Sequence, residues 1–237
     1  MSELEILMNL GLLCSSYLYI IAIILITGKI KDRLPSNFCR KFLHIMIGNF
    51  IFIIPFFTLR AFPLCFPFFV ASPFILITFL FSPASPVDLS GKFSGLAEVT
   101  GGGHKFGLVF YAISYTVLAL LFSNNPYVIA AGILPMAYGD AAASLAGQKF
   151  GQRIYRIFGT KSLEGSTAMF VISISGLLTL FLFFSHFYSI SISNWTLASI
   201  CTAAIATVSE ALTPKGFDNL TVPLLSAVVF LLLMGGL

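Results

Sequence analysis

Three acidic side chains occur inside or beside long apolar segments, where a charge is costly. Asp140 lies within MAYGDAAASLAGQKFG, at positions 136–151, and Glu210 and Asp218 lie in EALTPKGFDNLTVP, at 210–223. Ionisable residues in membrane-spanning segments are rare and typically mark functional sites. Carboxylate oxygens bind Mg²⁺, and such a metal neutralises phosphate oxygens during phosphoryl transfer. The candidate metal ligands are therefore Asp140, Glu210 and Asp218.

Basic and polar side chains that suit phosphate binding accompany these acids. KSLEGS, at 161–166, contains a lysine and a glutamate, and RKFLH, at 40–44, places three basic side chains on one side of a helix. Cationic groups stabilise the phosphate oxygens in phosphoryl transfer, so these blocks are candidate nucleotide or phosphate sites. The candidate residues are Arg40, Lys41, His44, Ser144, Lys161, Glu164, Lys215 and Asn219.

Two of these blocks also allow a purely structural interpretation. Ser162 followed by Glu164 resembles the start of a helix, where a serine side chain caps exposed backbone N–H groups. A basic cluster such as RKFLH at the start of a span commonly acts as a topology anchor. The local patterns alone leave both interpretations open.

The helix predicted around Asp140 has a stripe of small residues. Gly139, Ala143 and Gly147 recur every four positions, which predicts close packing against another helix. Asp140 and Ser144 fall on the adjoining face. In the structural interpretation a neighbouring lysine satisfies this acid. We favour a functional role, because intramembrane acids usually have one.

The composition predicts a membrane protein. Of the 237 residues, 58% are hydrophobic and only 9% are charged, whereas soluble domains contain about 25% charged residues. At about 20 residues per span, we predict an all-α bundle of about seven to eight transmembrane helices in a single domain, residues 1–237. The predicted spans are 5–27, 42–59, 62–81, 106–122, 126–147, 166–187, 195–212 and 219–236.

The distribution of basic residues predicts the orientation in the membrane. With eight spans, 12 of the 13 lysine and arginine residues fall in connections on one side. The positive-inside rule places that side in the cytoplasm and both termini on the opposite side. Asp140, Glu210 and Asp218 then lie near one level at the cytoplasmic face. An ion channel or transporter would instead be expected to spread its acids across the membrane depth.

The four blocks, in chain order, resemble the polyprenol kinase family. RKFLH, GDAAASLAGQKFG, KSLEGS and EALTPKGFDNLTVP carry the similarity, which covers about residues 38–225. The family contains dolichol kinases, phytol kinases and CTP-dependent diacylglycerol kinases. The resemblance implies a membrane enzyme that transfers the γ-phosphate of CTP to a lipid alcohol and uses Mg²⁺ or another divalent metal. Phytol, geranylgeraniol, a polyprenol, dolichol and diacylglycerol remain open as acceptors.

The resemblance also implies roles for individual residues. Asp140 and Asp218 are expected to bind the metal or the metal-bound phosphate, with Glu210 as a further metal candidate. Lys161 and Lys215 are expected to bind triphosphate oxygens. Either Glu210 or Asp140 would be the catalytic base, and the sequence does not separate them.

One alternative enzyme class shares these features. A cytidylyltransferase resembling CDP-diacylglycerol synthase would attack the α-phosphate of CTP and release pyrophosphate. No nucleic-acid partner is expected, and the sequence leaves the oligomeric state open.

Overall fold

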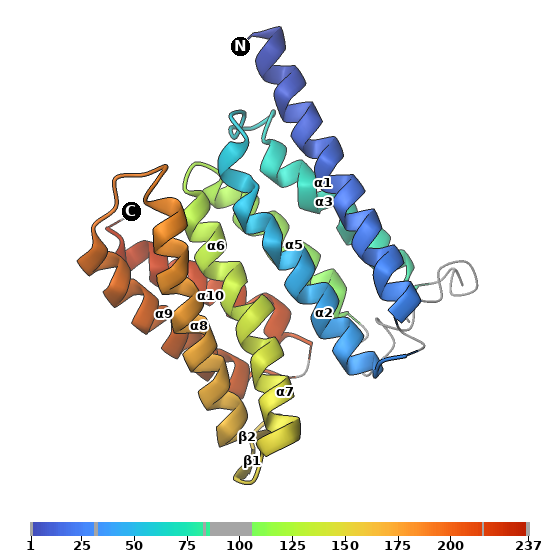
Figure 1. Cartoon of the computed structure of the whole chain (residues 1–237), viewed down its shortest axis with the longest axis vertical. Coiled ribbons are helices and arrows are strands. Elements are labelled where there is room, and N and C mark those ends of the chain that lie inside the picture. The colour runs from blue at the N-terminus through green and yellow to red at the C-terminus, as the bar shows by residue number, and fades with distance from the viewer. Residues whose placement is uncertain (1, 31–32, 83, 86–105, 215, 236–237) are drawn as a thin grey trace. The chain divides into compact units, whose positions relative to one another are not determined.

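The computed structural model describes residues 2–30, 33–82, 84–85, 106–214 and 216–235. Over these residues the chain is predominantly helical, with a single pair of short strands, which confirms the all-α prediction (Figure 1). The residues form two compact units, Met1–Asn124 and Asn125–Leu237.

The described residues of the first unit form four α-helices and two 3₁₀ turns. Their bounds are α1 Glu3–Ile30, α2 Ser36–Gly48, η1 Asn49–Phe52, η2 Ile54–Phe56, α3 Phe66–Leu80 and α5 Gly107–Phe122. Helix α3 packs along α5, and α1 contacts both α2 and α3.

A buried asparagine joins α1 to the segment that follows η2. The side chain of Asn9 is only 1% exposed. Its amide nitrogen donates to Thr58 Oγ1 at 2.8 Å, and its carbonyl oxygen accepts from the backbone N–H groups of Thr58 at 3.1 Å and Leu59 at 3.3 Å. Because buried polar groups are costly without partners, these bonds fix where α1 sits in this unit.

The predicted span 42–59 is a longer and less regular element. It occupies 37–56 as α2 followed by the two 3₁₀ turns. Helix α2 ends at Gly48, and Pro55 in the first turn of η2 has no N–H group to donate, so α-helical hydrogen bonding does not resume there.

The second unit contains the remaining described helices and the strand pair. Their bounds are α6 Pro126–Leu134, η3 Pro135–Gly139, α7 Asp140–Phe150, β1 Ile154–Arg156, β2 Thr160–Ser162, α8 Leu163–Phe184, α9 Ile192–Leu212 and α10 Asp218–Leu233. Helix α9 packs between α8 and α10, and α7 packs on α8.

An aromatic cluster fills the core of this unit near the start of α9. Trp195 is fully buried, and its indole nitrogen donates to the carbonyl oxygen of Leu177 at 2.8 Å. The ring of Phe230 lies 4.9 Å from it and the ring of Phe184 6.3 Å. These contacts anchor one end of α9, α8 and α10, while Glu210 lies near the other end of α9.

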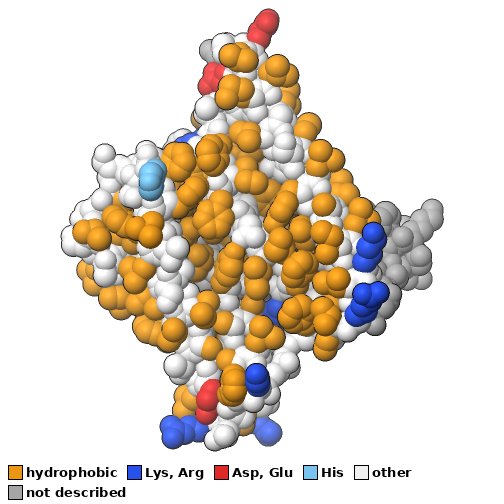
Figure 2. All heavy atoms as spheres, in the orientation of Figure 1, with side chains coloured by type: hydrophobic (Ala, Val, Ile, Leu, Met, Phe, Trp, Pro, Cys, Tyr) orange, Lys and Arg blue, Asp and Glu red, His pale blue; other side chains and the backbone are white. Residues whose placement is uncertain are grey.

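Several helices have the length and composition of membrane spans. Five described segments qualify, namely Glu3–Ile30, Asn37–Phe56, Pro126–Phe150, Leu163–Phe184 and Ile192–Leu212. Three shorter apolar helices accompany them, Phe66–Leu80, Gly107–Phe122 and Asp218–Leu233. Hydrophobic side chains cover the visible helix surfaces, and most charged side chains lie near helix ends (Figure 2). The chain is therefore an integral membrane protein.

Candidate active site

A local change of helix type positions Asp140. The segment Pro135–Gly139 is a π-helical turn between α6 and α7, in which the N–H of Asp140 donates to the carbonyl oxygen of Pro135. Such turns inside α-helices are uncommon and frequent at functional sites. Asp140 begins α7 and is only 8% exposed. Its carboxylate therefore lies within the helical bundle of the second unit.

Close packing of α7 on α8 holds this carboxylate in place. A Cβ atom added to Gly139 would lie 2.3 Å from Ser173 Oγ, and one added to Gly165 would lie 2.8 Å from the carbonyl oxygen of Ala143. A Cβ on Gly147 would lie 3.8 Å from the Cα of Gly165. The predicted small-residue stripe therefore does form the packing face of α7.

A short antiparallel hairpin connects α7 to α8 and carries Lys161. Tyr155 pairs with Lys161 across the two strands, so both side chains lie on the same face of the hairpin. The hydroxyl of Tyr155 also lies 2.6 Å from Ser166 Oγ, in the first turns of α8. Ser162 Oγ accepts from the backbone N–H of Gly165 at 3.1 Å and caps α8, as its sequence context predicted. The hairpin thus fixes Lys161 relative to α8.

Lys161 and Glu210 form a partly buried ion pair. The Lys161 ammonium donates to Glu210 Oε1 and to the backbone carbonyl oxygen of Glu210. The two side chains are 14% and 9% exposed, respectively. The pair links the hairpin to the last turn of α9, between residues separated by 49 positions in the chain.

The other two predicted acids lie near this pair. Asp140 and Asp218 both interact electrostatically with Glu210. Asp218 begins α10, where its Oδ1 accepts from the N–H of Gly216 at 3.1 Å and of Asn219 at 3.0 Å. Gly216 has a φ of 93°, a conformation that glycine adopts without strain. The structure therefore brings acids from α7, α9 and α10 into one charged region with Lys161.

The carboxylate oxygens in this region are suitable ligands for a hard cation that also binds substrate phosphates. In the part of the chain that the structure describes, no group of three or more His, Cys, Asp or Glu side chains is arranged to hold a metal ion by itself. Mg²⁺ usually keeps several waters and binds one or two carboxylates plus substrate phosphates. Asp140 and Asp218 offer carboxylates of this kind, whereas the Oε1 atom of Glu210 is engaged by Lys161.

Three further predicted residues lie around this region with different surroundings. Ser144 is one turn beyond Asp140 and accepts from Gln148 Nε2 at 3.2 Å. The Glu164 carboxylate accepts from the backbone N–H groups of Gln152 and Arg153 at 3.2–3.3 Å, so in this structure it closes the base of the hairpin. Asn219 is buried in the first turn of α10. The predicted phosphate ligand Lys215 lies outside the described residues.

The basic motif of α2 belongs to the first unit. Arg40 Nη2 donates to Asn37 Oδ1 at 2.8 Å, and Lys41 and His44 are 6% and 2% exposed. The His44 ring lies 4.9 Å from the ring of Tyr111, whose hydroxyl donates to the carbonyl oxygen of His44 at 3.0 Å. These residues share a helix, as predicted. Their role in binding phosphate stays a prediction.

The strand pair and the contribution of Tyr155 were missed from the sequence. IYR and TKS flank Gly159, and such alternation around a glycine is a weak hairpin signal. The segment is short, lies between predicted spans and is rich in basic residues, so the sequence favoured a basic loop here.

Comparison with known proteins gives one informative similarity. The chain is 33% identical over 214 residues to a phytol kinase from Synechocystis sp., and the match covers 87% of this chain and 84% of that protein. No protein-family model matches the chain. No solved structure matches it.

Proposed function

The chain belongs to the polyprenol kinase family and phosphorylates a lipid alcohol, and from that premise we propose that it transfers the γ-phosphate of CTP to an isoprenoid alcohol such as phytol or geranylgeraniol. The observation that carries this proposal is the charged region of the second unit, where the Lys161–Glu210 pair lies within electrostatic reach of Asp140 and Asp218. Phosphoryl transfer needs both a cation for the phosphate oxygens and a carboxylate for the attacking hydroxyl.

In the proposed reaction, the lipid hydroxyl oxygen attacks the γ-phosphorus of CTP. A new P–O bond to the lipid forms, the bond to the β–γ bridging oxygen breaks, and CDP leaves with that electron pair. The hydroxyl proton passes to a carboxylate. Two carboxylates are candidates for this role, Glu210 and Asp140.

Lys161 would stabilise the charge on the transferred phosphate. Its ammonium already lies in the charged region, where it is held by two oxygens of Glu210. Phosphate oxygens would compete for the same ammonium when the nucleotide binds. The hairpin and the Tyr155–Ser166 contact would keep Lys161 in position during this exchange.

A divalent metal would be held by Asp140 and Asp218 together with the nucleotide phosphates. Bound there, Mg²⁺ would neutralise the β- and γ-phosphate oxygens. The hydrogen bonds from Gly216 and Asn219 to Asp218 would orient that carboxylate toward its ligand. We further propose that this region faces the cytoplasm, where CTP is available, and that both termini lie on the opposite side.

The proposal is tested with purified protein in lipid nanodiscs. CTP labelled at the α or the γ position is supplied with phytol, geranylgeraniol, dolichol or diacylglycerol, and ATP replaces CTP in a parallel series. Transfer of γ-label to an isoprenoid alcohol, with release of CDP, is expected. Transfer of α-label to added phosphatidic acid, whose terminal phosphate oxygen would attack the α-phosphorus and displace pyrophosphate, would instead identify a cytidylyltransferase. Transfer from ATP but not from CTP would refute the proposed donor.

A further inference from the structure

The hairpin between α7 and α8 carries large apolar side chains on its surface. Four of them, from the end of α7 through the tip of the hairpin, are between 53% and 64% exposed. Such side chains gathered in one place commonly mark a contact with another molecule or with a membrane. Two arginines lie among them. The hairpin patch comprises Phe150, Arg153, Ile154, Arg156, Ile157 and Phe158.

The two faces of the hairpin have different surroundings. Tyr155 and Lys161 pair across the strands and share the less exposed face, where Lys161 binds Glu210. Ile154 and Arg156 alternate with Tyr155 and are exposed. Because successive side chains of a strand point to opposite faces, a partner can cover the exposed face without displacing the Lys161–Glu210 pair.

The charge of this segment is entirely basic. Residues 149–160 contain Lys149, Arg153 and Arg156 and no acidic residue, and all three basic side chains are exposed. Figure 2 shows lysine or arginine side chains beside hydrophobic ones at the lower end of the view, where Figure 1 places β1 and β2. The planar guanidinium group of arginine suits phosphate oxygens. The hairpin patch therefore combines apolar side chains with groups that bind phosphate, as surfaces that lie in the membrane interface do.

The flanking helices place the hairpin at the membrane surface. The span Pro126–Phe150 ends where the hairpin begins, and the span Leu163–Phe184 begins where it ends. At 1.5 Å per residue, the 25 residues of the first span extend about 37 Å, more than the hydrocarbon core of about 30 Å. The exposed side chains of the hairpin are therefore within reach of the lipid headgroups of the same membrane.

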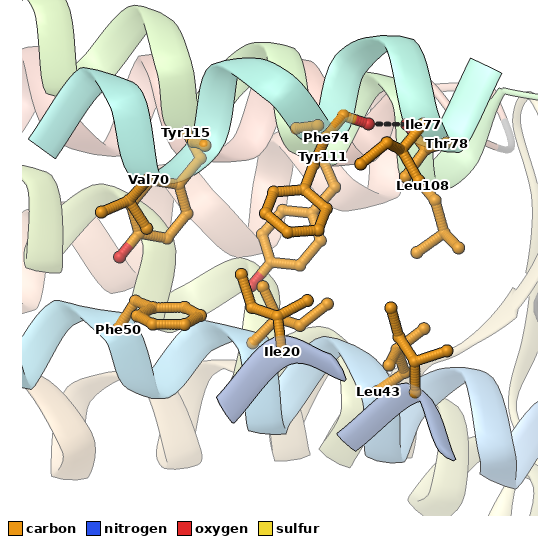
Figure 3. A pocket seen from close by; sticks show the side chains of 14 residues that line it. Ile20, Leu43, Phe50, Val70, Phe74, Ile77, Thr78, Leu108, Tyr111 and Tyr115 are labelled. Carbon is orange, nitrogen blue, oxygen red and sulfur yellow. Dashed lines mark hydrogen bonds between the residues drawn. The ribbon is translucent and has the colours of Figure 1, made fainter. Parts of the chain in front are cut away.

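The first unit also has an apolar surface, but it gives no comparable indication of its occupant. A pocket lies between α1, α2, α3 and α5, and aliphatic and aromatic side chains line it (Figure 3). Within the described residues this lining contains no charged side chain. The hairpin patch differs, because both its charge and its place at the ends of two spans point to one partner.

We propose that the hairpin patch docks into the headgroup layer of the surrounding membrane and selects anionic phospholipids there. Arg153 and Arg156 bind the lipid phosphates, and Ile157 and Phe158 at the tip insert between the headgroups. A soluble nucleotide would match the arginines but would leave most of the apolar side chains in water. The proposal goes beyond the proposed function and does not depend on it.

Site-specific photo-crosslinking to lipid tests this proposal without requiring turnover. The photoreactive amino acid p-benzoylphenylalanine replaces Phe158 in the full-length protein, in nanodiscs of equal parts phosphatidylglycerol and phosphatidylcholine. The same amino acid at Leu182 is the matched control, because both side chains are 64% exposed and residues 163–212 contain no lysine or arginine. Lipid adducts are identified by mass spectrometry, and the ratio of the two lipids at 158 is divided by the ratio at 182.

An excess of phosphatidylglycerol at 158 of about fivefold is expected, the effect of one basic side chain near an anionic surface. Arg153→Gln combined with Arg156→Gln should abolish the excess, whereas the two lysine substitutions should retain most of it. Because both arginines are exposed, all of these variants should unfold close to the wild-type temperature.

Three results would overturn the proposal. The first is the same lipid ratio at 158 and 182, or an excess that the glutamine substitutions leave unchanged. The second is labelling of lipid at 182 alone, or, in the membranes of the expressing cells, adducts at 158 with a protein or a second copy of the chain. The third is loss of the lipid adducts at 158 when CTP and Mg²⁺ are added, which would assign the patch to the nucleotide.

Discussion

Replacing Lys161 by methionine should destabilise the protein, because it leaves Glu210 buried without its counter-charge. Removing one partner of a buried ion pair costs about 3–5 kcal/mol. Lys161 is 14% exposed and Glu210 9% exposed, so solvent offsets part of that cost, and we expect the lower end, about 3 kcal/mol. The charges of Asp140 and Asp218 act in the same direction, since both repel an unpaired Glu210. For a chain of this size the melting temperature should fall by about 6–12 °C.

Thermal unfolding of purified variants measures this effect. Adding Glu210→Gln to Lys161→Met removes the unpaired charge, so the double variant should regain most of the lost stability. Lys149→Met is the matched control, an exposed lysine in the same unit, and should change stability by less than about 0.5 kcal/mol. If Lys161→Met lowers the free energy of unfolding by the same amount in the wild-type and in the Glu210→Gln background, the two charges are not coupled. That result would refute this explanation.

Three further predictions concern packing, metal binding and the first unit. Gly139→Ala should lower the free energy of unfolding by about 1–3 kcal/mol, because the added Cβ overpacks against Ser173 Oγ. Adding Ser173→Ala should restore most of that stability. A double variant that is as unstable as Gly139→Ala would exclude this contact as the cause. Asp218→Asn keeps a side-chain oxygen for the α10 turn, so folding should persist while the Mg²⁺ concentration for half-maximal activity rises about tenfold; an unchanged Mg²⁺ dependence would remove Asp218 from the metal site. Asn9→Ala leaves backbone groups near Thr58 unsatisfied and should cost about 1–3 kcal/mol; a neutral result in thermal unfolding would contradict the role of these bonds.

Features set by local sequence could be predicted well. Each long apolar run became helical, because a backbone in lipid has to satisfy its own hydrogen bonds. The cap at Ser162 and the small-residue face of α7 followed from residue type and helical spacing. Helix α8 begins at Leu163, three residues before the predicted start of its span, because the cap and not the hydropathy sets that boundary.

Features set by contacts between distant segments could not be predicted in the same way. The gathering of Asp140, Glu210 and Asp218 was inferred only through the predicted topology, which places the ends of three spans at one level. The pairing of Lys161 with Glu210 depends on the hairpin, whose short strands gave too weak a pattern to predict. The π turn before Asp140 was also missed, because local hydropathy is the same for a π turn and an α-helix.

The most direct test of the central claim is the rate of γ-phosphate transfer from CTP to lipid alcohol by purified Asp140→Asn. The account predicts a loss of about 10²–10⁴-fold, the usual contribution of a catalytic acid–base group, with thermal unfolding close to wild type. A folded Asp140→Asn protein that transfers phosphate at the wild-type rate would contradict the assignment of the reaction to this carboxylate region.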